Sequence, residues 1–170
     1  MLRYQSLALE QLSELYQLTH SHNRLVIKRR WLNQLTPLSL AVWWLDDGSL
    51  IGNGKCGVFC TDPFPLEDQK ILAQYLQKVW KVKVAIAKIV RERDGAKREY
   101  YRLWIRSSEE LKKFLRIILP YIPVASMLPK VILLYKDSQL QERWISEIIE
   151  KTSFSRDVIE KYLAEKKSRY

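Results

Sequence analysis

The stretch Leu35-Thr-Pro-Leu-Ser-Leu-Ala-Val-Trp-Trp-Leu-Asp-Asp-Gly48 decides the fold expected for this chain, because it ends an apolar segment with two carboxylates and a glycine. Thr36 suits the N-cap of a helix and Pro37 suits its first position, so a helix is predicted to begin here and to run into the acidic pair. Almost every residue from Leu38 to Leu45 is apolar or small. A helix without a polar side is predicted to be buried.

The acidic end of this helix is unusual, because the helix dipole disfavours carboxylates at the C-terminus by roughly 0.3–1 kcal/mol each. This local cost favours a metal-binding or catalytic role for Asp46 and Asp47. The simpler alternative is an ordinary turn after a helix. Gly48 is expected to provide a left-handed turn into the next element.

The same stretch resembles a motif of the LAGLIDADG homing endonucleases, in the branch that reads Leu-Thr-Pro-x-Ser-Leu-Ala-x-Trp-[Phe/Trp]-[Met/Leu]-Asp-Asp-Gly. In that family the motif helices of two domains pack together, and the last Asp of each binds a divalent metal at the scissile phosphates. The resemblance implies that Asp47 is catalytic and binds metal together with the peptide carbonyl of Gly48, while Asp46 supports the motif. The expected cofactor is Mg²⁺ or Mn²⁺, and Ca²⁺ is expected to bind without supporting cleavage.

Composition limits the class of protein. The 170 residues, 47% of them hydrophobic, suffice for one packed domain with a helical appendage. No apolar run reaches the roughly 18 residues of a membrane span, and no signal peptide is recognised, so an intracellular location is expected, in a bacterial cytoplasm or an organelle. The two cysteines, Cys56 and Cys60, are interpreted as small core residues rather than as a disulfide or zinc site.

Charge indicates the partner. The chain has 29 Lys and Arg against 19 Asp and Glu, a formal net charge of +10, and a polyanion is the natural partner of such a surface. An anionic membrane would also suit the charge, but no long basic amphipathic helix is present, so no membrane partner is predicted. Charge alone leaves DNA and RNA both open.

Residues 1–34 are expected to form an N-terminal helix and a basic connector. Leucines recur near helical spacing between residues 7 and 18, whereas the two histidines that follow lack a third metal ligand nearby. Arg24 resembles a basic residue that precedes a Val/Ile-Pro pair in two-repeat members of the family, although Ile27 stands in place of that proline. The resemblance gives Arg24 a supporting role.

Residues 35–135 are predicted to form the core domain. After the motif helix, alternation and turn residues predict a hairpin, a helix, a second hairpin and a further helix. The expected segments are residues 49–61 with a turn at Asn53-Gly54, 66–80, 82–93 with 99–106 joined at Asp94-Gly95, and a helix from Ser107. The order is an α+β fold, α-β-β-α-β-β-α, as in the LAGLIDADG homing endonucleases, with an antiparallel DNA-binding sheet.

One face of this sheet is predicted to be basic and aromatic and to lie along a DNA groove. The first strand of the second hairpin is less regular than the second, which suggests a bulge. A solvated charged surface is the alternative to DNA binding. The residues expected to contact DNA are Lys55, Phe59, Thr61, Lys83, Lys88, Arg91, Arg93, Lys97, Arg98, Tyr100, Arg102, Trp104 and Arg106.

A second match to the family lies at Ser126-Met-Leu-Pro-Lys-Val131. The family has Ser-Met-x-Tyr-Lys-[Ile/Leu] at this place, so the resemblance assigns Lys130 to its active-site lysine, which acts near the scissile phosphate. Pro129 replaces the usual tyrosine.

The remaining residues, 136–170, are expected to form a helical extension with helices near 137–150 and 155–167. Its second helix is rich in cations. A solvated face is the simpler interpretation of these cations, and contact with the DNA backbone is the other. They are Arg156, Lys161, Lys166, Lys167 and Arg169.

The hypothesis that follows is a site-specific double-stranded DNA endonuclease that hydrolyses phosphodiester bonds with a divalent metal. Cutting two strands needs two sites, but the chain has one Asp-Asp-Gly motif, so a homodimer through the 36–47 helix is expected. Ala41 and its neighbours would allow the close approach of the second helix. The target would be near-palindromic and on the order of 20 bp.

The alternative hypothesis is a non-cleaving nucleic-acid-binding protein of the same fold. An intron-splicing maturase, with intron RNA as its partner, and a transcriptional regulator are both of this kind. The basic segment near Arg24 fits this alternative, since it is what the trailing part of a two-repeat ancestor would keep.

Overall fold

The computed structural model describes residues 9–169, except for the side chain of Arg93. The helix predicted at residues 7–18 is α1, and its first two predicted positions lie outside the described residues. The basic connector contains a two-stranded hairpin and one helical turn, which are too short to leave a periodic pattern. These elements are α1 (Glu10–Thr19), β1 (His20–Ser21), β2 (Arg24–Leu25) and α2 (Arg29–Leu32).

The motif helix α3 (Pro37–Asp47) begins as predicted, since Thr36 and Ser39 form a reciprocal capping box and Pro37 occupies the first turn. Its burial differs from the prediction. Leu38 and Val42, one turn apart, are 52% and 59% exposed. Ala41 is fully buried inside the chain, so the expectation that Ala41 itself allows the close approach of a second helix is wrong, whereas its neighbour Val42 is exposed.

Gly48 does not form a left-handed turn. Its φ is −84° in extended backbone, and it is the first residue of strand β3. A Cβ at this position would lie 2.3 Å from Cε3 of Trp44, so glycine is required by close packing and not by an unusual φ. Trp44 fills the space that a side chain at residue 48 would need.

A four-stranded antiparallel sheet in the order β3-β4-β6-β5 forms the second layer. The pairing of β5 with β6 is unbroken over its whole length, so the suggested bulge is absent. Both hairpin turns are at the predicted places, where Asn53, Gly54, Asp94 and Gly95 all have positive φ. The strands are β3 (Gly48–Ile51), β4 (Cys56–Phe59), β5 (Ala85–Arg93) and β6 (Ala96–Ile105).

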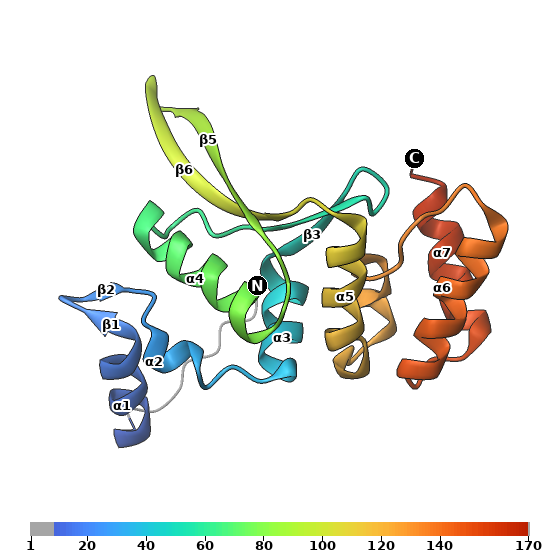
Figure 1. The fold of residues 1–170 in the computed structure, drawn as a ribbon, viewed down its shortest axis with the longest axis horizontal. Helices are drawn as coiled ribbons and strands as arrows, with labels where there is room; N and C mark the ends of the chain where they lie inside the picture. The colour runs from blue at the N-terminus through green and yellow to red at the C-terminus, as the bar shows by residue number, and fades with distance from the viewer. Residues whose placement is uncertain (1–8, 170) are drawn as a thin grey trace.

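Helices cover one face of the sheet. Figure 1 shows α3, α4 and α5 beneath the strands, while the β5–β6 hairpin extends well beyond them. Trp44, Phe59 and Phe114 meet edge to face at ring distances of 5.2–5.3 Å and join the motif helix, the sheet and α5 into one core. The helices are α4 (Leu66–Val79) and α5 (Ser108–Ile118), followed by the 3₁₀ segments η1 (Leu119–Tyr121) and η2 (Ala125–Lys130).

The C-terminal extension is the predicted helical pair, α6 (Ser138–Lys151) and α7 (Arg156–Lys167). The two helices stand beside α5, and the C-terminal end of α7 rises on the same side of the molecule as the β5–β6 hairpin (Figure 1). In the described part of the chain, no helix has the length and apolar character of a membrane span. The order helix, hairpin, helix, hairpin, helix within residues 35–135 confirms the predicted α+β fold.

Candidate active site and nucleic-acid interface

Asp46 and Asp47 are the last two residues of α3, and both are exposed. The peptide carbonyl of Asp47 accepts a hydrogen bond of 3.0 Å from the amide of Cys60, which ties the end of the helix to the end of β4. Among the hydrogen bonds and ion pairs of the described residues, none uses the carboxylate of Asp47. Its two oxygens are therefore free to bind a cation.

Gly48 offers a second oxygen. The bond from Cys60 to Asp47 makes Gly48 and Phe59 a non-hydrogen-bonded pair of the antiparallel ladder. The carbonyl of Gly48 thus makes no ladder bond to β4, and β3 is an edge strand with no other neighbour in the sheet. A carboxylate and a free carbonyl lie side by side along the chain.

Lys130 reaches the same end of α3 from η2. Its ammonium donates hydrogen bonds to the carbonyls of Leu45, at 2.6 Å, and Asp46, at 3.1 Å. In return, Nε1 of Trp44 donates to the carbonyl of Lys130 at 2.9 Å. A lysine is well suited to this place, because a positive charge is stabilised by the negative end of the helix dipole. The two sequence motifs, 85 residues apart, are joined by these three bonds.

These residues could supply some of the ligands of a divalent metal ion, but not a complete set. Hard oxygen donors such as the Asp47 carboxylate and the Gly48 carbonyl suit Mg²⁺, which usually keeps several waters and binds one or two carboxylates together with substrate phosphates. In residues 9–169, no three His, Cys, Asp or Glu side chains gather into a metal-binding group. A metal ion held here would take its remaining ligands from water, from DNA oxygens or from another copy of the fold.

Among the described residues, no hydrogen bond or ion pair brings Arg24 to this site. It lies exposed on β2, and no hydrogen bond or ion pair between described residues joins it to Asp46, Asp47 or Lys130. Its neighbour Leu25 does line an apolar pocket of about 410 Å³ that Asp47 also borders. The supporting role of Arg24 stays a prediction.

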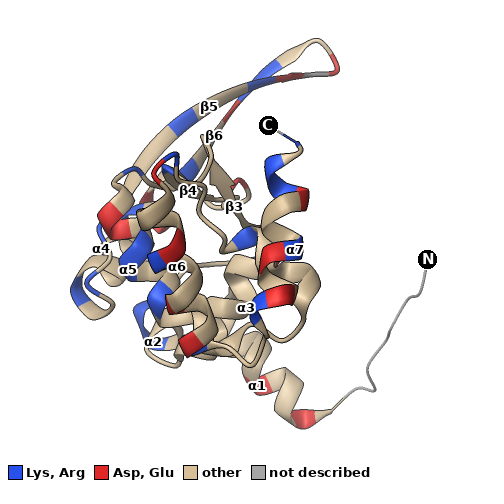
Figure 2. Ribbon diagram, turned by 90° about the vertical axis from the view of Figure 1, so that its right-hand side faces the viewer, with Lys and Arg blue, Asp and Glu red and all other residues tan. Residues whose placement is uncertain are grey.

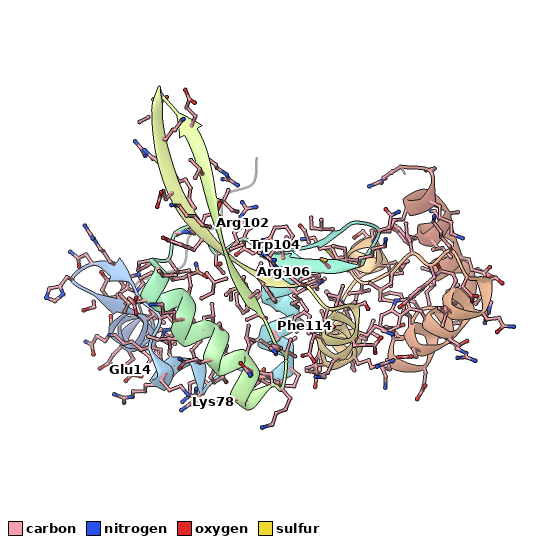
Figure 3. All side chains as sticks on the ribbon, turned by 45° about the horizontal axis from the view of Figure 1, so that its top comes forward. Glu14, Lys78, Arg102, Trp104, Arg106 and Phe114 are labelled. Atoms are coloured by element: carbon pink, nitrogen blue, oxygen red, sulfur yellow. The ribbon has the colours of Figure 1, made fainter. Side chains whose placement is uncertain are left out.

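The face of the sheet away from the helices, here called the outer face, is defined by the register of the strands. Leu103 and Ile105 of β6 are buried against the helices, so the alternate residues of β6 point outward. Figure 3 shows Arg102, Trp104 and Arg106 following one another along this strand. The predicted DNA-binding residues that the register places on the outer face are Arg91, Arg98, Tyr100, Arg102 and Trp104, and Arg106 follows directly after the end of β6.

Asp62 lies among these cations and was missed at the sequence level. Its carboxylate accepts two hydrogen bonds from Arg102, at 2.5 and 2.8 Å, and pairs with Arg91 at 3.1 Å. The Arg102 guanidinium holds the pKa of the Asp62 carboxyl below its usual range. In the sequence Asp62 directly precedes Pro63, and no local pattern connects it to Arg91 and Arg102, which lie 29 and 40 positions away.

Phe59 and Thr61 are buried, so the prediction that they contact DNA is wrong. Phe59 is 0% exposed and points to the helices in the row of Leu103, while Thr61 is 1% exposed. The Thr61 hydroxyl donates to Gln69 Oε1 at 2.8 Å within a buried polar cluster. The alternation predicted for residues 49–61 has the correct period of two, but its two sides were assigned to the wrong faces. The apolar Val58 lies on the outer face, opposite Trp104, and is buried there.

The other predicted contacts are distributed around the sheet. Lys88 and Lys97 share the face of Tyr101 on the extended hairpin, where Lys88 pairs with Glu99. Lys83 precedes β5, and Lys55 lies exposed in the β3–β4 turn. The backbone of Arg93 pairs with Ala96, but its side chain lies outside the described part of the structure. Figure 2 shows cations along the hairpin and at the end of α7.

Lys166 of α7 is the least expected residue near the site. It is only 7% exposed, and its ammonium donates to the carbonyls of Pro129, at 2.6 Å, and Ile132, at 2.7 Å. Burial lowers the pKa of Lys166 to about 8. The interpretation of the tail lysines as a solvated face is therefore wrong at this position. The spacing of Ile159, Leu163 and Lys166 was the available signal, because it places a lysine on the buried stripe of the helix.

Comparison with known proteins decides the family. The model of the LAGLIDADG DNA endonuclease family matches residues 1–114. This chain belongs to that family. Its membership agrees with the two motifs that the structure joins at the end of α3.

Two relatives of the LAGLIDADG chain are informative. The cytochrome b mRNA maturase bI2 of Saccharomyces cerevisiae is 34% identical over 97 residues, which are 57% of this chain and 21% of the maturase. The structure titled "The homing endonuclease I-WcaI bound to its DNA recognition sequence" superimposes with a TM-score of 0.58 at 20% identity, over 72% of this chain and 52% of that one. The chain spans about a fifth and about half of these relatives, and the second likeness shows the fold.

Proposed function

We propose that this LAGLIDADG chain is a site-specific double-stranded DNA endonuclease that requires Mg²⁺ or Mn²⁺ and acts with a second copy of itself. The observation that carries the proposal is the meeting of Asp47, the Gly48 carbonyl and Lys130 at one end of α3. The same end of α3 leads directly into β3, the edge of the sheet with the basic outer face. DNA lying on that face would bring its backbone to Asp47.

The proposed chemistry assigns a role to each group. A divalent metal held by Asp47 and the Gly48 carbonyl would stabilise charge on the phosphate and activate water. Lys130 spends two of its three ammonium hydrogens on the carbonyls of Leu45 and Asp46, which holds it in place, and keeps one for the phosphate. The outer face supplies phosphate contacts and base-edge contacts.

The cleavage test uses a DNA library that includes the locus carrying the gene. Wild type with Mg²⁺ is expected to cut, Asp47→Asn to bind DNA without cutting, and the control Glu67→Gln, an exposed change on α4, to cut like wild type. Ca²⁺ should support binding without cleavage. If wild type nicks nothing in the library, or if Asp47→Asn cuts at the wild-type rate, the proposal fails.

The homodimer is supported by the exposed side of α3. Leu38 and Val42 form an apolar strip that ends beside Asp46, and pairing two such strips about a twofold axis would place two Asp47 residues together. Sedimentation should give twice the chain mass of 20.2 kDa. Val42→Lys should shift the protein to monomer, whereas Val79→Lys, on an exposed position of α4, should not. A wild-type monomer with and without DNA would refute the dimer.

A splicing function is the second candidate, because the yeast relative is named as an mRNA maturase. This function needs the basic surface but not the carboxylate of Asp47. An intron transcript that contains the gene would splice faster with wild type and equally fast with Asp47→Asn. Splicing that neither protein accelerates would exclude this candidate, and splicing that depends on Asp47 would contradict the claim that its carboxylate is not needed.

A further inference from the structure

A hollow of about 310 Å³ lies between strand β3, the η2 segment and the end of α7, and its lining is cationic. It is lined by Ser49, Leu50, Pro129, Lys130, Lys166 and Arg169. Three of these six residues carry a positive charge and none carries a negative one. Cations gathered around one space repel each other unless an anion neutralises them.

The donors of this hollow are only partly used. Lys130 gives two hydrogens to the carbonyls of Leu45 and Asp46, and Lys166 gives two to those of Pro129 and Ile132. Each ammonium has three hydrogens, so one remains on each. In the described part of the chain, the guanidinium of Arg169 takes part in no hydrogen bond or ion pair. The two lysines are thus held rigidly by the backbone, and each has one donor to spare.

The hollow also adjoins the outer face of the sheet. Ser49 pairs with Val58, Val58 with Trp104, and Trp104 with Ala85, so Ser49 begins a row that crosses the outer face. The end of α7 rises on the same side as the β5–β6 hairpin, and both carry cations (Figures 1 and 2). A polyanion on the outer face would therefore pass over the mouth of the hollow.

We propose that this hollow is a phosphate-binding site for the DNA backbone, in which Arg169 and the remaining donor of Lys166 hold one phosphate of the strand that approaches Asp47, other than the phosphate to which Lys130 is assigned. The C-terminal extension thereby contributes directly to DNA binding. Arg169 binds the phosphate, and Lys166 both binds it and fixes the segment that carries Lys130. The inference rests on the proposed function, because it requires DNA on the outer face.

The test compares two variants that each remove one positive charge from the end of α7. Arg169 lines the hollow, whereas Lys167, two residues earlier, is exposed and does not. Affinity for a random-sequence duplex is measured with wild type, Arg169→Gln and Lys167→Gln between about 50 and 200 mM salt. Each phosphate contact contributes about 0.9 to the slope of log affinity against log salt. Arg169→Gln should lower that slope by about 0.9, and Lys167→Gln should leave it nearly unchanged.

Phosphate ethylation of a duplex that contains the cleavage site found in the library shows whether the lost contact is a single one. On this duplex, ethylation at one discrete phosphate should weaken the binding of wild type and Lys167→Gln but not that of Arg169→Gln. If both variants lower the slope equally, or Arg169→Gln behaves as wild type, the site is refuted while DNA binding stands. If wild type binds no duplex, the proposed function fails, and this site fails with it.

Discussion

Gly48→Ala tests how the packing of the motif helix positions Asp47. The added Cβ would lie 2.3 and 2.4 Å from two ring carbons of Trp44 and 2.5 Å from its peptide oxygen. Ordinary contacts of a Cβ begin at 3.4 Å, so the overlap is about 1 Å. Rotation of the indole cannot relieve it, because the peptide oxygen of the same residue is also in the way.

The size of the effect follows from this geometry. Over-packing a dense core costs about 1–3 kcal/mol, and a clash with both ring and backbone belongs at the upper end. Alanine lowers the entropy of the unfolded chain, which returns about 0.4–1 kcal/mol. The free energy of unfolding should therefore fall by about 2 kcal/mol. In the variant that still folds, Asp47 should be displaced, and the proposed cleavage should be slower.

Urea denaturation followed by circular dichroism measures this loss. Gly95→Asn is the control, because Gly95 has a φ of +73° with open space around it, and asparagine tolerates that backbone conformation. The free energy of unfolding of this variant should stay within about 0.5 kcal/mol of the wild-type value. In a Trp44→Leu background, Gly48→Ala should cost at least about 1 kcal/mol less. A Gly48→Ala variant as stable as the control, or an equal cost in both backgrounds, would refute the reasoning.

Two further predictions concern charge. Asp62→Asn frees Arg102 from its counter-ion, so the affinity for a random-sequence duplex at low salt should rise several-fold and depend more steeply on salt. The control Glu99→Gln, on the opposite side of the hairpin, should change this affinity little. Weaker binding by Asp62→Asn than by wild type in a filter-binding assay would contradict the prediction. The pKa of Lys166 is about 8 in the folded chain, compared with 10.5 for an ordinary lysine, which is the value expected in the unfolded chain. Between these pH values the unfolded chain therefore holds more protons than the folded chain. The free energy of unfolding should rise with pH across this range, by up to ~3 kcal/mol. The free energy of unfolding of Lys166→Met should not show this rise. If urea denaturation between pH 8 and 10.5 gives the same pH dependence for wild type and Lys166→Met, the prediction is wrong.

Much of the fold was predictable because its signals are local. The capping box at Thr36, the turns at Asn53-Gly54 and Asp94-Gly95, and the N-cap at Ser107 each depend on residues within three or four positions of one another. The outward alternation of β6 was predicted correctly as well, since charged and apolar side chains differ clearly there. Such patterns appear in any sequence that forms the same helices and hairpins.

The face of β4 could not be decided locally. Its two sides are both apolar or small, and only the pairing of Phe59 with Leu103 determines that Phe59 joins the core. The free side of α3 was undecidable for the same reason. Every position from Leu38 to Leu45 could be buried, and the packing of Trp44 against Phe114 orients the helix so that Val42 is exposed.

The sequence by itself determined the order of elements and the motif that ends in Asp47 and Gly48, and its resemblance to a family led to the prediction of a role for Lys130. Tertiary structure alone decided what surrounds them. The bonds from Lys130 to the end of α3, the pairing of Asp62 with Arg102 and the burial of Lys166 join residues that lie 34–85 positions apart. Local propensities carry no information about such contacts, because they form only when the helices and the sheet pack against one another.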